Sequence, residues 1–208
     1  MLPMRRGDIE GTLQALVGGA RVGLGSDANT DDHAKSRSLT MKTPDAQELA
    51  DREAIREVAN RYAHGVDRID GDCMKSAYWP DATDDHGVFV GNAWEFVDHC
   101  MASHVRWRTT MHTTTNHQIE VEPSGTAARG ELYNVTHLFQ ADHPTLDTWY
   151  GRYLDQYEKR GDEWRIIHRV CVHEGTTSRP IETPMAIAAD RFRQGDFDRQ
   201  SPGRPIGP

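Results

Sequence analysis

The spacing of apolar residues predicts helices in the first half of the chain and strands in the second. After Thr43-Pro44-Asp45, apolar side chains recur every three to four positions, which places them on one face of a helix. This apolar stripe comprises Ile55, Val58, Ala59, Tyr62 and Val66. The helix is expected to start with Thr43 as its N-cap and Pro44 at its first position.

Shorter elements follow this helix. We expect a short helical piece at residues 74–79 that ends at Pro80-Asp81, a short strand at 87–91, and a second amphipathic helix at 93–104. The pattern then changes, because Val, Ile, Thr, Tyr and Trp become frequent and turn sequences separate the segments. Successive strands are expected at residues 111–122, 128–140, 148–159 and 164–174.

Helices followed by a run of hairpins predict an α+β fold, in which a curved antiparallel sheet packs against helices on one side. A chain of 208 residues is long enough for one good core and short for two. We therefore expect one domain at residues 43–180, preceded by a flexible extension at 1–42 and followed by a C-terminal helix or tail at 181–208.

The first residues superficially resemble a secretion signal, because Arg5-Arg6 precede a mildly apolar stretch. Asp8 lies before that stretch, Arg21 interrupts it and glycines dilute it, so it makes a poor signal core. The polar segment that follows has no periodicity, as expected of a flexible chain. Met41 is a second candidate for the start of translation.

Composition narrows the classes of function. The net charge is −8, from 24 basic and 32 acidic residues, which disfavours nucleic acid as the main partner. The three cysteines, Cys73, Cys100 and Cys171, form neither a disulfide framework nor a CxxC site and indicate a reducing, cytoplasmic environment. No apolar run approaches the roughly 20 residues that cross a bilayer.

Two residues at the ends of predicted elements are candidates for acid–base chemistry. Asp67 lies in the last turn of the long helix and borders its apolar stripe, where a carboxylate is costly unless paired. His112 opens the first long strand within a run of small polar residues. A carboxylate beside His112 would fix its tautomer and make it a competent general base. The simpler interpretations are a solvent-facing acid at a helix end and a structural histidine.

The 11 histidines invite a metal-binding interpretation that their spacing disfavours. His112 and His117 are five residues apart, as are His168 and His173, and an odd spacing on a regular strand puts two side chains on opposite faces. No HxH or HExxH motif occurs, and Asp84-Asp85-His86 fits a solvated turn as well as a ligand set. No metal is expected and, without GxGxxG or a P-loop, no nucleotide cofactor either.

The last predicted strand carries an unusual row of side chains. Alternation places Arg169, Cys171 and His173 on one face, and Ile166, His168, Val170 and Val172 on the other. The first set suits a pocket wall, in which Arg169 stabilises an anion or a leaving group. A solvent-facing surface is the alternative.

Several motifs occur in order along residues 46–175. They are Asp51-Arg52-Glu53-Ala54-Ile55, Tyr62-(x)4-Asp67, Trp79-Pro80-Asp81-Ala82, Met111-His112 with Asn116, and the hairpin of residues 151–160 closed by 163–169. Together they resemble the SnoaL-like branch of the nuclear-transport-factor-2-like superfamily, and most closely its cofactor-free dehydrochlorinase, scytalone dehydratase and bile-acid dehydratase group.

The resemblance implies roles for particular residues. In those enzymes a histidine abstracts a carbon-bound proton while an aspartate orients it, and these map onto His112 and Asp67. Tyr62 matches a catalytic tyrosine of the bile-acid enzymes, and Arg169 a leaving-group arginine of the dehydrochlorinase. Asp84 departs from the dehydrochlorinase, which has a tryptophan there, and this argues for a more polar substrate.

The resemblance also implies a cone-shaped, cystatin-like α+β barrel with a deep apolar cavity for a hydrophobic cyclic or aromatic substrate. Six residues are expected to contact that substrate: Trp79, His86, Asn116, Tyr153, Cys171 and His173. The expected activity is a lyase reaction without a cofactor, either dehydratase-type elimination or aldehyde-releasing C–C cleavage, in a homotrimer or homodimer. The alternatives are a non-catalytic ligand-binding or subunit module and a polyketide-cyclase-like aldol catalyst.

Overall fold

The structure is a computed structural model that describes residues 43–182, 185–186, 188 and 191–192. Every described residue belongs to the unit of residues 42–208. The expected extension at residues 1–42 and most of the expected tail at 181–208 therefore lie outside the described residues.

The long helix α1 spans Ala46–Asp67, and its predicted apolar stripe is buried. Its N-cap is Asp45, not Thr43, because the Asp45 side chain accepts a hydrogen bond from the Glu48 backbone N–H at 2.9 Å. Asp51, six residues after Asp45, accepts from Lys159 Nζ at 2.9 Å and from Trp164 Nε1 at 2.8 Å. These contacts attach the start of α1 to the hairpin at the end of the sheet.

The segment after α1 differs from the prediction. Helix α2 spans only Gly71–Lys75, and strand β1 (Tyr78–Asp85) begins where the helical piece was expected to continue. Pro80 lies inside β1 and does not end it, at the place where the pairing of β1 with its neighbour is irregular. Proline has no N–H to donate, so a strand tolerates it where the ladder is already interrupted.

The remaining elements follow the predicted order. They are β2 (Val90–Asn92), α3 (Ala93–His104), β3 (Trp107–Val121), β4 (Ala127–Gln140), β5 (Thr145–Arg160) and β6 (Glu163–Pro180). The Asn92 side chain caps α3 by accepting from the backbone N–H of Trp94 at 2.9 Å. None of the described helices is both long and apolar enough to cross a membrane.

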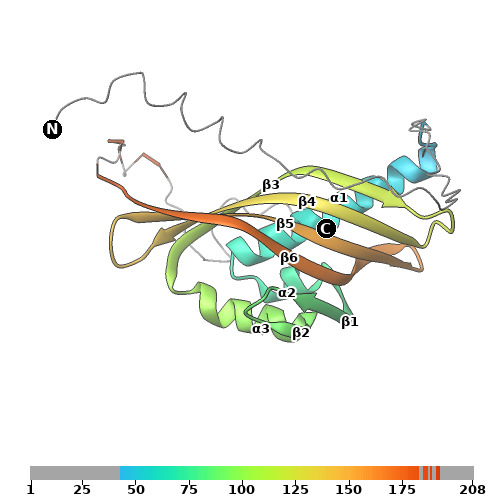
Figure 1. Cartoon of the computed structure of the whole chain (residues 1–208), viewed down its shortest axis with the longest axis horizontal. Helices are drawn as coiled ribbons and strands as arrows, with labels where there is room; N and C mark the ends of the chain where they lie inside the picture. Colours follow the sequence, from blue (N-terminus) through green and yellow to red (C-terminus); the bar gives the residue numbers. More distant parts are fainter. Residues whose placement is uncertain (1–42, 183–184, 187, 189–190, 193–208) are drawn as a thin grey trace, which may run out of the picture. The chain divides into compact units, whose positions relative to one another are not determined.

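The strands form one six-stranded sheet in the order β2-β1-β6-β5-β4-β3, so the predicted α+β fold class is confirmed. Strands β3 to β6 are antiparallel neighbours, as expected, whereas β1 runs parallel to β6. Helix α1 lies against one face of the sheet, and α2 and α3 lie beside β1 (Figure 1). The sheet is curved and unclosed.

Among the irregularities in the ladder, one in β3 and one in β6 change which side chains face α1. In β3, Thr114 pairs with Asn134 but His117 pairs with Leu132, so β3 contains one extra residue there. In β6, His168 pairs with Gln156 but Ile166 pairs with Tyr157, which again leaves one extra residue. Each irregularity exchanges the inward and outward positions beyond it. Ile166 is therefore buried in the core and not on the outer face predicted by alternation.

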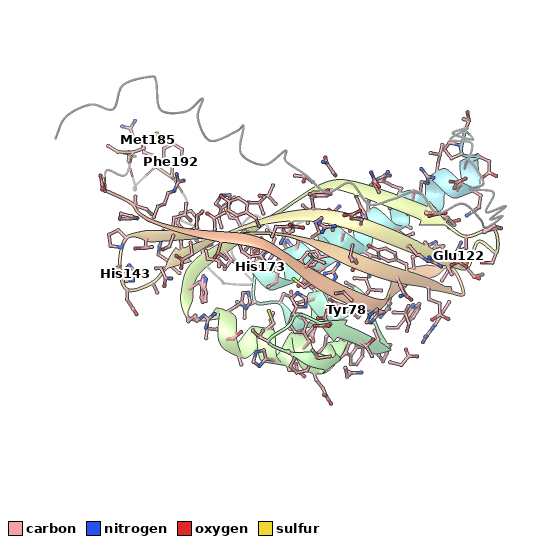
Figure 2. All side chains as sticks on the ribbon, viewed as in Figure 1. Tyr78, Glu122, His143, His173, Met185 and Phe192 are labelled. Atoms are coloured by element: carbon pink, nitrogen blue, oxygen red, sulfur yellow. The ribbon has the colours of Figure 1, made fainter. Side chains whose placement is uncertain are left out.

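The core lies between α1, α3 and the sheet. Its apolar members include Val58, Met74, Val97, Leu132 and Ile166, all buried. Tyr78 lies near the junction of β1 and β6, while Glu122 and His143 mark hairpin turns at opposite ends of the sheet (Figure 2).

Gly65 offers a direct test of the packing of α1 on α2. A Cβ added there would lie 2.5 Å from the Met74 backbone N, so one of the helices must shift. Gly65→Ala should lower the free energy of unfolding by about 1–3 kcal/mol, although alanine favours a helix by up to about 1 kcal/mol. The measurement is urea unfolding, with Gly175→Ala as the control because nothing lies within 4 Å of an added Cβ there.

Candidate active site

Asp67 and His112 meet where the end of α1 faces β3. His112 Nδ1 lies 2.6 Å from Asp67 Oδ1, and the His112 backbone N–H donates to Asp67 Oδ2 at 2.8 Å. The Asp67 side chain is 18% exposed and the His112 side chain 7%. The Asp67 carboxylate at the end of α1 thus bonds both the ring and the backbone of His112, which fixes the position of the imidazole.

Asp67 accepts a further hydrogen bond, from a threonine on β3. Thr110 Oγ1, two residues before His112 on the same face of β3, donates to Asp67 Oδ1 at 2.7 Å. Thr110 Oγ1 and the His112 backbone N–H both donate to Asp67. An ionised carboxylate can only accept, so its contact with Nδ1 favours the tautomer of His112 that is protonated on Nδ1. Nε2 of His112 has no hydrogen-bond partner among the described residues, and this is the nitrogen that a general base would use.

Tyr62 stands beside this pair, one and a half turns earlier on α1. Its ring meets the His112 ring edge-on, with centroids 6.5 Å apart. Burial, together with the neighbouring Tyr153 and Tyr78, raises the pKa of Tyr62 well above its ordinary value, although Arg169 acts in the opposite direction. Tyr62 therefore stays protonated near neutral pH, and its hydroxyl can both donate and accept a hydrogen bond.

A second carboxylate–imidazole pair lies on the other side of Tyr62. His86 Nε2 is 3.3 Å from the Tyr62 hydroxyl, and His86 Nδ1 contacts Asp84 Oδ1. Asp84 is 1% exposed and also accepts from the Tyr78 hydroxyl at 2.7 Å. His86 was expected to contact substrate. Asp84 was expected either in a solvated turn or in a ligand set, and its burial excludes the solvated turn for Asp84.

Arg169 is fully buried and bound on one side by Asp155. Its Nε and Nη2 each lie 2.7 Å from an Asp155 oxygen, in a bidentate pair. The guanidinium lies 4.2 Å from the Tyr62 ring centroid and 4.1 Å from that of Tyr153. Nη1 is buried without a partner among the described residues. Arg169 thus brings a positive charge to the tyrosines, and its Nη1 is the donor still available.

Sequence reasoning missed Asp155, although the sequence holds a signal for it. Tyr153, Asp155 and Tyr157 alternate along β5, and all are buried. An acid between two tyrosines on the inward face of a strand requires a buried partner. The Tyr157 hydroxyl is one such partner, since it donates to Asp155 Oδ2 at 2.7 Å.

The pocket-facing row predicted on β6 is present in the register. Arg169, Cys171 and His173 pair across the ladder with Asp155, Tyr153 and Gly151. Burial raises the pKa of the Cys171 thiol to about 12, so Cys171 is not a nucleophile near neutral pH. The His173 ring lies 6.1 Å from that of Trp149, which in turn stacks on Tyr153. His173 is thus further along the same wall.

Two residues that were expected to contact substrate lie apart from these groups. Trp79 donates its Nε1–H to the Glu158 carbonyl at 2.9 Å, and the guanidinium groups of Arg160 and Arg165 each lie 4.8 Å from the centroid of its ring. Asn116 is exposed and lies within the irregular part of β3. None of these contacts connects Trp79 or Asn116 with His112 or Tyr62.

The spacing argument against a metal site needs a correction. The extra residue in β3 places His112 and His117 on the same face, not on opposite faces. They nevertheless bind different partners, because His117 Nε2 lies 3.3 Å from the Tyr157 hydroxyl. Among the described residues, no group of three or more His, Cys, Asp or Glu side chains could hold a metal ion.

An open groove of about 540 Å³ crosses strands β3, β4, β5 and β6. Its lining includes Gln118, Leu154, His168 and Val170, and neither Asp67 nor His112 belongs to it. His168 bonds Thr83 Oγ1 through Nδ1 at 2.7 Å, away from the candidate catalytic groups. The groove is therefore a different feature from the cavity that the resemblance implies.

The sequence matches the SnoaL-like domain family over residues 47–170, and the chain belongs to that family. This span contains every candidate residue described above except Cys171 and His173. No protein in a search of curated sequences matches the chain.

Solved structures share the fold at low sequence identity. A Novosphingobium aromaticivorans protein, provisionally named a scytalone dehydratase, has a TM-score of 0.57 and 17% identity over 67% of this chain and 98% of its own. A hexachlorocyclohexane dehydrochlorinase from Novosphingobium barchaimii has a TM-score of 0.59 and 20% identity over 70% and 99%. A Mycobacterium tuberculosis protein of unknown function has a TM-score of 0.56 and 22% identity over 64% and 76%.

Asp155→Asn should destabilise the protein strongly, because it leaves the buried Arg169 guanidinium without its counter-charge. The expected loss in the free energy of unfolding is about 3–5 kcal/mol. Asp81→Asn is the matched control, since Asp81 and Arg160 form a bidentate pair at 2.8 and 2.9 Å on the surface. Losing that exposed pair should cost far less, because solvent screens it. Equal losses in urea unfolding would contradict the role given to burial.

The stability of the protein should fall between about pH 6.5 and pH 4 through His117. Burial lowers the pKa of His117 to about 4, from 6.5 in the unfolded chain. The unfolded state therefore takes up a proton first as pH falls, so the contribution is complete above pH 6.5 and is lost towards pH 4. His117→Gln should reduce the drop in unfolding free energy over this window by roughly 2 kcal/mol. His143→Gln, in an exposed turn, should leave the drop unchanged.

Proposed function

We propose that the protein is a cofactor-independent lyase in which His112 abstracts a proton from the substrate. The observation that carries the proposal is the Asp67 carboxylate, which binds both Nδ1 and the backbone N–H of His112 and leaves Nε2 unoccupied among the described residues. A fixed imidazole with one free nitrogen is the arrangement that general-base catalysis requires.

Asp67 acts by orientation and charge. Its carboxylate holds the Nδ1–H tautomer and stabilises the imidazolium that forms when Nε2 takes a proton. Thr110 supports it by holding the carboxylate in place. A non-catalytic module, the main alternative, gives no reason for a threonine, an aspartate and a histidine from two elements to converge in this way.

Tyr62 and Arg169 act on the charge that develops in the reaction. Tyr62 is a neutral donor beside the His112 ring, and the Arg169 guanidinium lies over the Tyr62 ring at 4.2 Å. Donors and charges fixed in a buried site stabilise a developing anion more than they would in water. Asp155 occupies two of the Arg169 donor atoms, so a direct contact with substrate would use Nη1.

The substrate class is a hydrophobic cyclic or aromatic molecule with an acidic C–H bond. Aromatic rings surround Tyr62: Tyr153 at 5.5 Å and Tyr78 at 6.0 Å between centroids, with Trp149 stacked on Tyr153. Such rings favour a flat apolar ligand, and the hydroxyl and imidazole groups among them would orient a polar substituent. Elimination of water fits these groups best, while aldehyde-releasing C–C cleavage requires the same base.

The aldol adduct of benzaldehyde and acetone is a probe for both reactions. Loss of water yields benzalacetone, whereas C–C cleavage yields benzaldehyde and acetone, and chromatography separates the two outcomes. His112→Ala should lower kcat/KM by about 10²–10⁴-fold, the usual contribution of a general base. Asp67→Asn should also lower it, because the tautomer and the charge both change.

His168→Ala is the matched control, since His168 lies on the same sheet but bonds Thr83 outside the site. It should keep the activity of the unaltered protein. Full activity in folded His112→Ala, or an unaltered protein that is inert on the adduct, would contradict the proposed function.

A further inference from the structure

Asp84 and His86 form a second carboxylate–imidazole pair that the role of His112 as a base does not use. Asp84 comes from β1, and His86 follows directly after that strand. The pair touches Tyr62 from the side of α3, whereas Asp67 and His112 lie at the junction of α1 with β3. Tyr62 therefore stands between two histidines, each bound to its own aspartate.

The orientation of the His86 ring is fixed on three sides. Phe96 stacks on it with centroids 4.1 Å apart and an angle of 17° between the planes. With the ring held flat, Nδ1 contacts Asp84 Oδ1 and Nε2 lies 3.3 Å from the Tyr62 hydroxyl. Both nitrogens thus have protein partners, so His86 is not free to take a proton from substrate itself.

The surroundings of His86 permit a positive charge on the ring. Asp84 from β1 faces Nδ1, Tyr62 from α1 faces Nε2, and Tyr153 from β5 lies 5.8 Å away between centroids. Phe96 from α3 and Arg169 from β6 complete the set, the latter on the far side of the Tyr62 and Tyr153 rings. A buried carboxylate in direct contact outweighs a cation that is already paired with Asp155.

We propose that Asp84 and His86 supply a proton to Tyr62, whose hydroxyl protonates the leaving group. This inference rests on the proposed function and adds the acid to its base. Tyr62 touches the substrate, while His86 and Asp84 act through Tyr62 and are positioning residues.

The proton balance closes over one turnover. His112 Nε2 takes the proton from carbon, and the electron pair of that C–H bond forms the new double bond. The C–O bond breaks, its electron pair stays on oxygen, and the Tyr62 hydroxyl proton joins that oxygen to release water. The Tyr62 oxygen then receives the Nε2 proton of the His86 imidazolium, which becomes neutral. His112 has gained one proton and His86 has lost one, and exchange with solvent restores both.

A tyrosine in this place needs such a donor behind it. Burial raises the pKa of Tyr62, so a phenolate left after proton transfer is costly and must be neutralised quickly. The His86 Nε2–H lies within hydrogen-bond reach to do so, and the Arg169 charge over the ring stabilises the phenolate in the meantime.

The test compares two leaving groups on one carbon skeleton. The aldol adduct of benzaldehyde and acetone must lose hydroxide, which requires an acid, whereas its para-nitrophenyl ether loses nitrophenolate, which does not. His86→Gln should lower kcat for loss of water about 100-fold or more and change nitrophenolate loss by less than about 3-fold. His112→Ala should lower both.

The pH profile gives a second readout that a structural role would not move. In the unaltered protein, kcat for loss of water should show an alkaline limb that nitrophenolate loss lacks, because only the first reaction needs the proton that reaches Tyr62 through His86. That alkaline limb should disappear in His86→Gln and in Asp84→Asn. Asp84→Asn is the second variant that tests the relay if His86→Gln does not fold, and it should slow loss of water without slowing nitrophenolate loss.

His99→Gln is the matched control, because His99 is exposed on α3 and its ring lies beside Phe89. It should change neither reaction. Equal slowing of both leaving groups in folded His86→Gln, or no slowing of either, would overturn the relay while leaving the role of His112 intact. Activity retained by His112→Ala, or an unaltered protein inert on both probes, would overturn the proposed function and the relay with it.

Discussion

The pairing of buried carboxylates is the constraint on which the interior of this protein depends. Asp51 and Asp67 on α1, Asp84 on β1 and Asp155 on β5 each need donors, because the surrounding aromatic core cannot solvate a charge. Asp51 takes its donors from Lys159 and Trp164, Asp155 from Arg169 and Tyr157, Asp84 from Tyr78 and His86, and Asp67 from Thr110 and His112. Each pairing joins different elements of the fold or holds a strand end against the core. The contacts that neutralise these charges therefore also hold the elements of the fold together.

Two of these pairings differ from the others because the partner of the aspartate is an imidazole. Lys159 and Arg169 hold charges that stay fixed, whereas His86 and His112 can each change protonation state beside a carboxylate. Tyr62 lies between them and belongs to the same helix as Asp67. The site therefore has two protonic groups on different sides of one tyrosine, which suits a reaction that removes a proton from one atom and delivers one to another.

The sequence was informative where periodicity is regular and misleading where the sheet is irregular. Helix α3 and the four long strands could be predicted because their apolar patterns are uninterrupted, and Asp67 and His112 because they end or begin such patterns. The face of the sheet on which Ile166 and His117 lie could not be predicted. One extra residue in a strand leaves no mark in composition, yet it moves the side chains beyond it to the opposite face. The role of Asp155 was missed because its partner Arg169 comes from another strand. The role of Asp84 was missed because its partner Tyr78 lies on β1, a strand that was not predicted because Pro80 was expected to end a helix.

The protonation of His112 tests the central claim most directly. Nitrogen-15 NMR of the imidazole distinguishes a protonated from an unprotonated ring nitrogen. The account predicts that, above the pH at which His112 is charged, Nδ1 carries the proton and Nε2 does not, because Asp67 accepts from Nδ1 at 2.6 Å. Asp67→Asn should weaken this preference. A neutral His112 that is protonated on Nε2 in the unaltered protein would leave no base facing the substrate and would contradict the account.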